Sequence, residues 1–118
     1  RYKVVDNTVL KGLVLSSTDL NPGHSTSGHK HAGQEEVYMF IRGKGSMTLS
    51  YPDGKVSEFN VSSGDIVLIE DDVHHRVENT DDEEKLYFVC VFDGKRSPAH
   101  ALTSSSNFTG FLRPQFGQ

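Results

Sequence analysis

Two histidines and a glutamate stand close together in residues 23–43, whose sequence is GHSTSGHKHAGQEEVYMFIRG. Residues two apart on a β-strand point to the same face of a sheet, so His29 and His31 present both imidazoles to one side. Gly33 then permits a turn, and Glu36 can begin the next strand beside them. The segment therefore predicts two imidazoles and one carboxylate on a shared face.

Alternation along the next expected strand, residues 36–42, divides its side chains between two faces. Glu36, Tyr38 and Phe40 share one of these faces. If that face looks into the protein interior, the Glu36 carboxylate joins the two imidazoles there. Tyr38 is then a candidate to orient a ligand or to act as an acid in proton transfer. Packing as an interior aromatic is the alternative role for its ring.

The pair His74-His75 supplies a fourth candidate group. Residues that alternate with His75 on a strand include Val73 and Val77, whereas those that alternate with His74 are charged. Because the more apolar set belongs inside, we expect His75 to point inward and His74 outward. Three imidazoles and one carboxylate suit a borderline divalent metal such as Fe, Mn, Ni, Co or Zn. On an octahedral ion they would leave about two positions for water or a substrate.

A periodicity close to two recurs along the chain, and no segment keeps the spacing of an amphipathic helix. The dipeptide Asp53-Gly54 after Pro52 predicts a tight turn between two strands of a hairpin. We expect strands over residues 9–16, 29–31, 36–42, 46–51, 56–61, 66–69, 75–79 and 86–92. Strands at this spacing predict an all-β fold, an antiparallel sandwich or barrel.

A chain of 118 residues can bury one core and one internal cavity. We expect the barrel to occupy residues 1–96. Residues 97–118 are polar and irregular, with a few apolar anchors, and we expect this tail to pack over the barrel or over a neighbouring subunit, with fraying as the alternative.

Composition argues against several classes of protein. The 12 Lys and Arg residues form no basic cluster and are outnumbered by 16 Asp and Glu, so nucleic-acid binding is not expected. The apolar runs are much shorter than the roughly 20 residues that span a bilayer, so no membrane partner is expected either. Cys90 is the single cysteine, which excludes an internal disulfide and a cysteine-based zinc site. A reducing compartment is compatible with this, and we expect a cytoplasmic protein.

The histidine and glutamate spacing resembles the first motif of the cupin superfamily, G-x5-H-x-H-x3 or 4-E-x6-G. Gly23, His29, His31, Glu36 and Gly43 fall at the motif positions, with the four-residue option before the glutamate.

The second cupin motif, G-x5-P-x-G-x2-H-x3-N, matches in part. Gly64, His75 and Asn79 fall at its positions, whereas Glu70 replaces the proline and Asp72 replaces the glycine. These departures are expected to alter a turn rather than a ligand.

The resemblance implies an antiparallel double-stranded β-helix, the jelly-roll barrel of cupins, and a homodimer formed by strand exchange or sheet packing. It also implies the metal-ligand positions, which are His29, His31, Glu36 and His75. The function expected first is a metal-dependent enzyme acting on a small oxygen-rich molecule by Lewis-acid chemistry, such as a sugar or sugar-phosphate isomerase. An iron-dependent dioxygenase is the second hypothesis, and a non-enzymatic module that binds a small ligand is the third.

Overall fold

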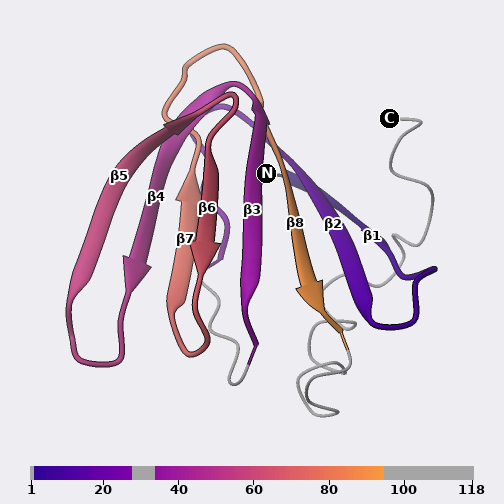
Figure 1. Cartoon of the computed structure of the whole chain (residues 1–118). Coiled ribbons are helices and arrows are strands. Elements are labelled where there is room, and N and C mark those ends of the chain that lie inside the picture. Colours follow the sequence, from indigo (N-terminus) through magenta and orange to yellow (C-terminus); the bar gives the residue numbers. More distant parts are fainter. Residues whose placement is uncertain (1, 28–33, 95–118) are drawn as a thin grey trace.

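The computed structural model describes residues 2–27 and 34–94 (Figure 1). These residues form strands, turns and irregular segments, and among them no helix is long and apolar enough to cross a membrane. The strands are β1 (Tyr2–Asn7), β2 (Leu13–Leu20), β3 (Glu36–Arg42), β4 (Lys44–Ser50), β5 (Val56–Ser62), β6 (Ile66–Ile69), β7 (His74–Glu78) and β8 (Leu86–Asp93).

The strands form two sheets in which every neighbouring pair is antiparallel. One sheet has the order β1-β2-β8-β3-β6 and the other has the order β5-β4-β7. The sheets face each other and meet toward the top of Figure 1. This arrangement is the jelly-roll barrel, which confirms the predicted all-β antiparallel fold.

The alternation of side chains along each strand sets the inner face of both sheets, as the sequence predicted for β3 and for β7. Side chains are buried at every second position of β3, β7 and β8, because these positions point between the sheets. The core they form consists of Leu20, Tyr38, Phe40, Met47, Leu49, Val61, Ile69, Val73, Val77, Leu86, Phe88, Cys90 and Phe92. Glu36 and His75 are buried on the same inner faces.

The N-terminal strands depart from the prediction. The strand expected at residues 9–16 lies at Leu13–Leu20 instead, and Tyr2–Asn7 forms a strand that was not predicted. Val9 and Leu10 lie in the connection between these strands and are 86% and 64% exposed. The inner face of β2 carries polar residues, so its sequence lacks the alternation of apolar and polar side chains by which strands were predicted. The strand expected at 29–31 and the tail at 97–118 lie outside the described residues.

Gly43 ends the first motif at the sharp turn between β3 and β4. Its φ is +93°, a conformation that L side chains rarely adopt. A Cβ atom there would also lie directly against the backbone carbonyl oxygen of Lys85. The position therefore needs glycine for two separate reasons, close approach and backbone conformation.

Asp72 occupies the position where the second motif has glycine, and its φ is +63°. Asp is one of the few residues other than glycine that enters this left-handed region at modest cost. The substitution therefore lies in the turn before β7, in agreement with the expectation that it alters a turn rather than a ligand.

A row of polar side chains crosses the inner face of the larger sheet. Cross-strand register aligns Asp6 with Ser16, Ser16 with Cys90, and Cys90 with Tyr38. Ser16 forms side-chain hydrogen bonds with both Asp6 and Cys90. Asp6 is only 4% exposed, and burial raises the pKa of its carboxyl from 3.8 to about 6. The barrel interior therefore contains an acid that titrates near neutral pH.

Asp6→Asn is predicted to stabilise the protein above pH 6. Between about pH 4 and pH 6 the folded state retains a proton that the unfolded state releases, so the stability contributed by the carboxyl falls as the pH rises through this window. The variant should melt roughly 3–8 °C above the parent protein at pH 8 and close to it at pH 4. Thermal unfolding followed by circular dichroism measures both, with exposed Asp82→Asn as the control. An equal difference in melting temperature between the variant and the parent protein at both pH values would contradict the raised pKa of Asp6.

Candidate metal centre

Glu36 and His75 meet in the space between the two sheets. Glu36 is the first residue of β3 and His75 is the second residue of β7, and both strands begin at the lower end of Figure 1. The Nε2 atom of His75 lies 3.1 Å from Oε2 of Glu36. The two residues are 2% and 4% exposed. The barrel thus holds a carboxylate and an imidazole against each other away from solvent.

A backbone contact sets the orientation of the His75 ring. Its Nδ1 atom lies 3.2 Å from the carbonyl oxygen of Val73. A carbonyl oxygen can only accept, so Nδ1 is the donor and Nε2 is the atom that faces Glu36. Metal-binding histidines in proteins commonly donate their second ring N–H to a carbonyl in this way.

The spacing of the two groups also fits a shared ion. Two neighbouring ligands at about 2.1 Å from an octahedral metal lie about 3 Å apart, which agrees with the 3.1 Å between Nε2 and Oε2. Nitrogen and oxygen donors of these types suit a borderline divalent metal. The residues present therefore fit the kind of metal that the sequence predicted.

Tyr38 lies beside this pair, as the alternation of β3 predicted. Its ring meets the His75 ring edge-on at 5.5 Å between centroids and stacks on Phe88 at the same distance. Burial, followed by the negative charge of Glu36, raises the pKa of Tyr38 well above its usual value of 10. The hydroxyl therefore stays protonated and can act as a hydrogen-bond donor.

Cys90 is on the inner face of β8, opposite Tyr38. Burial, followed by the nearby carboxyls of Glu36 and Asp6, raises the pKa of its thiol well above 9. A neutral buried thiol is a weak nucleophile and packs as a small apolar group. Cys90 therefore contributes to the wall of the interior.

Two of the four predicted ligands can be placed. Glu36 and His75 lie together, and His74 points outward and is exposed, as expected. His29 and His31 lie outside the described residues. Within the part of the chain that the structure describes, no three His, Cys, Asp or Glu side chains gather in a way that could hold a metal ion. The complete four-residue set stays a prediction.

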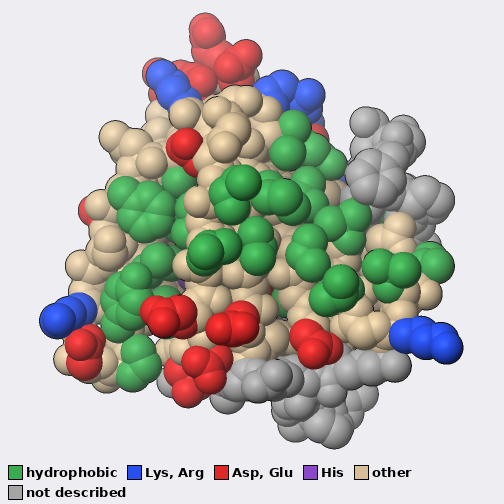
Figure 2. Space-filling view, in the orientation of Figure 1, with side chains coloured by type: hydrophobic (Ala, Val, Ile, Leu, Met, Phe, Trp, Pro, Cys, Tyr) green, Lys and Arg blue, Asp and Glu red, His purple; other side chains and the backbone are tan. Residues whose placement is uncertain are grey.

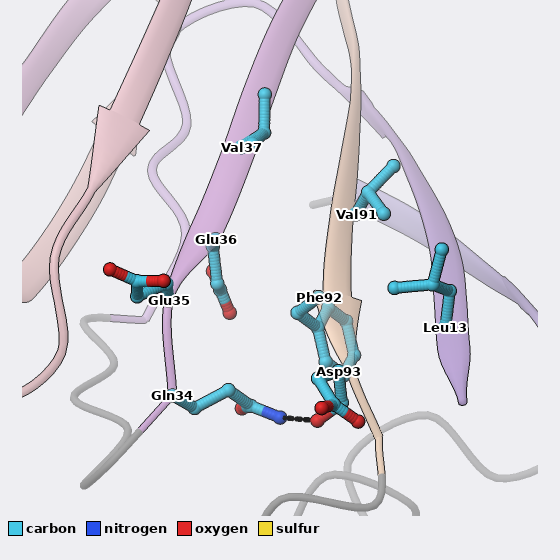
Figure 3. Close-up of a pocket in the computed structure, with 8 residues that line it drawn as sticks. All are labelled: Leu13, Gln34, Glu35, Glu36, Val37, Val91, Phe92 and Asp93. Atoms are coloured by element: carbon cyan, nitrogen blue, oxygen red, sulfur yellow. Dashed lines mark hydrogen bonds between the residues drawn. The ribbon is translucent and has the colours of Figure 1, made fainter.

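A pocket of about 280 Å³ lies at the ends of β2, β3 and β8 (Figure 3). Gln34, which is 2% exposed, donates a hydrogen bond from Nε2 to the backbone carbonyl oxygen of Asp93 across this pocket. The contact ties the residues just before β3 to the end of β8 and so helps to fix the position of Glu36. No local pattern in the sequence predicts this contact, because the two residues are 59 positions apart.

Asn79, the last residue of the second motif, has a structural role. Its side-chain nitrogen donates to the carbonyl oxygens of Leu20 at 3.0 Å and Glu84 at 2.8 Å, and its side-chain oxygen accepts from the backbone nitrogen of Asp81 at 2.9 Å. Asn79 is 1% exposed. This buried amide joins the end of β2 to the connection between β7 and β8.

The chain is similar in sequence to several curated proteins. Glucose-6-phosphate isomerase of Thermococcus onnurineus is 36% identical over 114 residues, which cover 90% of this chain and 60% of that protein. The chain spans about 60% of the length of the curated isomerases that it matches first.

Solved structures agree with the fold. A predicted oxalate decarboxylase from Thermotoga maritima superposes with a TM-score of 0.60 at 29% identity, covering 70% of this chain and 67% of that one. Oxalate decarboxylase of Bacillus subtilis, studied for its Mn(II) centers, gives a TM-score of 0.68 at 30% identity, covering 77% of this chain and 25% of that one. The family model described as "Cupin domain" matches residues 16–92, which run from β2 to β8. The chain therefore belongs to the cupin family.

Proposed function

We propose that this cupin binds one divalent transition metal through His29, His31, Glu36 and His75. The observation that supports the proposal most strongly is the buried contact between Glu36 and His75, whose donor atoms lie 3.1 Å apart at the spacing of two ligands on one ion. The hydrogen bond from His75 Nδ1 to Val73 supports it further, since it leaves Nε2 to bind. The Mn(II) centers named for the related oxalate decarboxylase support a transition metal.

We propose that the protein is an enzyme that acts on a small oxygen-rich molecule. When bound, the metal would supply Lewis-acid polarisation of a carbonyl and its neighbouring hydroxyl. Glu36 and His75 would hold the metal, and Tyr38 would donate a proton or hydrogen bond from its hydroxyl to a substrate oxygen. The aromatic rings of Phe40 and Phe88 pack beside Tyr38 and would exclude water.

Isomerisation of a sugar or sugar phosphate is the reaction that we propose first. Its support is the similarity to several glucose-6-phosphate isomerases, of which the chain spans about 60%. The turn before β7 carries Glu70, Asp71 and Asp72, which would repel a phosphate that approached from that side. Both a neutral sugar and its phosphate are therefore candidate substrates, and their turnover is to be compared.

An iron-dependent dioxygenase is the second candidate. The observation that favours it is the stacked aromatic wall of Tyr38, Phe40 and Phe88 beside the proposed metal ligands, because an apolar, dry cavity protects reactive oxygen species from water. A non-enzymatic small-ligand-binding module is the outcome that remains if a metal binds and no turnover follows.

We further propose that the protein is a cytoplasmic homodimer. The single buried Cys90 is compatible with a reducing compartment. On the outer face of the larger sheet, Ile66 and Leu68 of β6 are 64% and 72% exposed, and a second copy would cover these apolar side chains.

His75→Ala is predicted to abolish metal binding while the fold is retained. Loss of one of four ligands should reduce the metal content from near one mole per mole of chain to about a tenth of that. Elemental analysis of untagged protein measures the content, and circular dichroism checks the fold. His74→Ala is the matched control, since this neighbour is exposed and should keep its metal. Undiminished metal in the His75 variant would mean that another group holds the ion.

The metal-loaded protein is predicted to interconvert an aldose and its ketose without oxygen. We expect turnover with zinc or manganese under anaerobic conditions. NMR spectroscopy of reactions with glucose and with glucose 6-phosphate measures the conversion of each aldose to its ketose. Oxygen uptake that requires iron and substrate, without isomerisation, would instead support the dioxygenase. A metal-loaded protein that does neither would support a binding module.

Tyr38→Phe is predicted to lower kcat by roughly 10–100-fold with unchanged metal content and thermal stability. Phenylalanine keeps the ring contacts with Phe88 and His75 and removes the hydroxyl alone. Steady-state kinetics of the metal-loaded variant measures the effect. An unchanged kcat would assign Tyr38 to packing, the alternative role for this residue.

A further inference from the structure

A short segment pairs with β7 at the outer edge of the smaller sheet. β7 is an edge strand of this sheet, whose order is β5-β4-β7. Residues 23–26, which follow β2, lie along it, and Ser25 is opposite Glu78 in an antiparallel bridge. The backbone nitrogen of Asn79 donates to the carbonyl oxygen of His24 at 2.9 Å. The chain that leaves β2 is therefore held beside β7 before it reaches the first histidines of the motif.

Thr26 holds the end of this segment against β7. Its backbone nitrogen donates to the carbonyl oxygen of Val77 at 2.9 Å. Its hydroxyl accepts a hydrogen bond from the backbone nitrogen of Val77 at 3.1 Å and lies 3.4 Å from the same carbonyl oxygen. A hydroxyl can make both contacts because it is a donor and an acceptor. Thr26 therefore satisfies the two backbone groups that Val77 presents at the edge of the sheet.

The direction of the bridge brings the chain toward the proposed ligands. In an antiparallel pair, rising residue numbers on one side correspond to falling numbers on the other. The chain that continues from Thr26 is therefore directed along β7 from Val77 toward His75. His29 follows Thr26 by three positions, and His75 precedes Val77 by two. The hydroxyl of Thr26 thus fixes the chain shortly before two proposed ligands, on the strand that carries a third.

Gln34 fixes the chain on the other side of the two histidines. Its side chain donates to the backbone carbonyl oxygen of Asp93 at the end of β8, as Figure 3 shows. Gln34 follows His31 by three positions and precedes Glu36 by two. It is 2% exposed, so water competes little for this contact. One fixed point therefore lies on the smaller sheet and the other on the larger sheet, and each is close in sequence to a proposed ligand.

Fixed points on both sides favour metal binding because they reduce the cost of ordering the ligands. A segment that is free in the metal-free protein loses conformational freedom when its side chains bind an ion, and this loss opposes binding. Hydrogen bonds that the folded protein has already formed leave less freedom to be lost. Neither residue has to touch the metal for this effect.

We propose that Thr26 and Gln34 are positioning residues of the metal site and fix the chain on either side of His29 and His31. The inference rests on the metal binding proposed above and adds two residues that bind no metal themselves. It gives the Thr26 hydroxyl and the Gln34 amide a role in metal affinity, beyond the stability that a hydrogen bond contributes to the fold.

A test of this role has to leave the charge at this end of the barrel unchanged. Figure 2 shows acidic side chains gathered across the lower part of the molecule, and β3 and β7 begin at this end in the same orientation in Figure 1. Acidic groups attract a divalent cation whether or not its ligands are positioned. Uncharged replacements therefore separate positioning from electrostatic attraction.

Thr26→Val and Thr26→Ser test the first fixed point. Valine keeps the branched shape of threonine without the hydroxyl, whereas serine keeps the hydroxyl. We expect Thr26→Val to raise the dissociation constant for Mn(II) roughly tenfold and Thr26→Ser to leave it within about twofold of the parent value. Titration of the full chain with Mn(II), followed by the EPR signal of the free ion, measures each constant. Thr48→Val is the matched control, because Thr48 is partly exposed on β4 in the same sheet.

Gln34→Met tests the second fixed point. Methionine is similar in length and has no hydrogen-bond donor, so the contact with Asp93 is lost while the charge stays the same. We expect the dissociation constant for Mn(II) to rise roughly tenfold. Asn60→Leu is the control, because it removes an exposed amide on β5 and should leave the constant unchanged. Thermal unfolding of each metal-free variant is the separate readout of fold stability.

The outcomes distinguish the positioning roles from the metal site itself. A parent protein that binds no Mn(II) would overturn the proposed metal site and this inference with it. If the parent protein binds Mn(II), an unchanged constant in Thr26→Val or in Gln34→Met would overturn the role of that residue, even if the metal-free variant melts at a lower temperature. Binding that is weakened equally by Thr26→Ser and Thr26→Val would show that the hydroxyl is not the group responsible.

Discussion

The burial of the Glu36 carboxylate against the His75 imidazole is the constraint on which this account depends. The two residues come from different sheets, so their contact requires the sheets to close on each other at the ends where β3 and β7 begin. A buried carboxylate is costly unless it is paired or binds a cation. Gln34 and Val73 hold the surrounding backbone and the imidazole ring in place.

The alternation of β3 connects this interior with the surface. Residues that point inward, such as Tyr38, line the centre, and residues that point outward, such as Met39, contribute to the open apolar face. Because the side-chain period of a strand is two, a shift of one residue in register would exchange these sets and remove both features together. The polar row from Asp6 to Tyr38 is specified by the same register.

Local alternation explains why the inward-facing positions of β3 and β7 could be predicted from sequence. It distinguished His75 from His74 and placed Glu36 and Tyr38 on one face, because each decision needed only neighbouring residues. It could not reveal contacts between distant positions, such as that of Gln34 with Asp93. The prediction of the N-terminal strands was wrong for a related reason. β2 carries Ser and Thr on its inner face, where the pattern anticipates apolar side chains.

A crystal structure of the metal-loaded protein, with anomalous scattering recorded at the absorption edge of the bound metal, tests the central claim most directly. We expect one strong anomalous peak per chain, about 2.2 Å from both His75 Nε2 and a carboxylate oxygen of Glu36. Nitrogen atoms of His29 and His31 should complete the set. A bound metal that peaks elsewhere, with the direct contact between Glu36 and His75 intact, would contradict it.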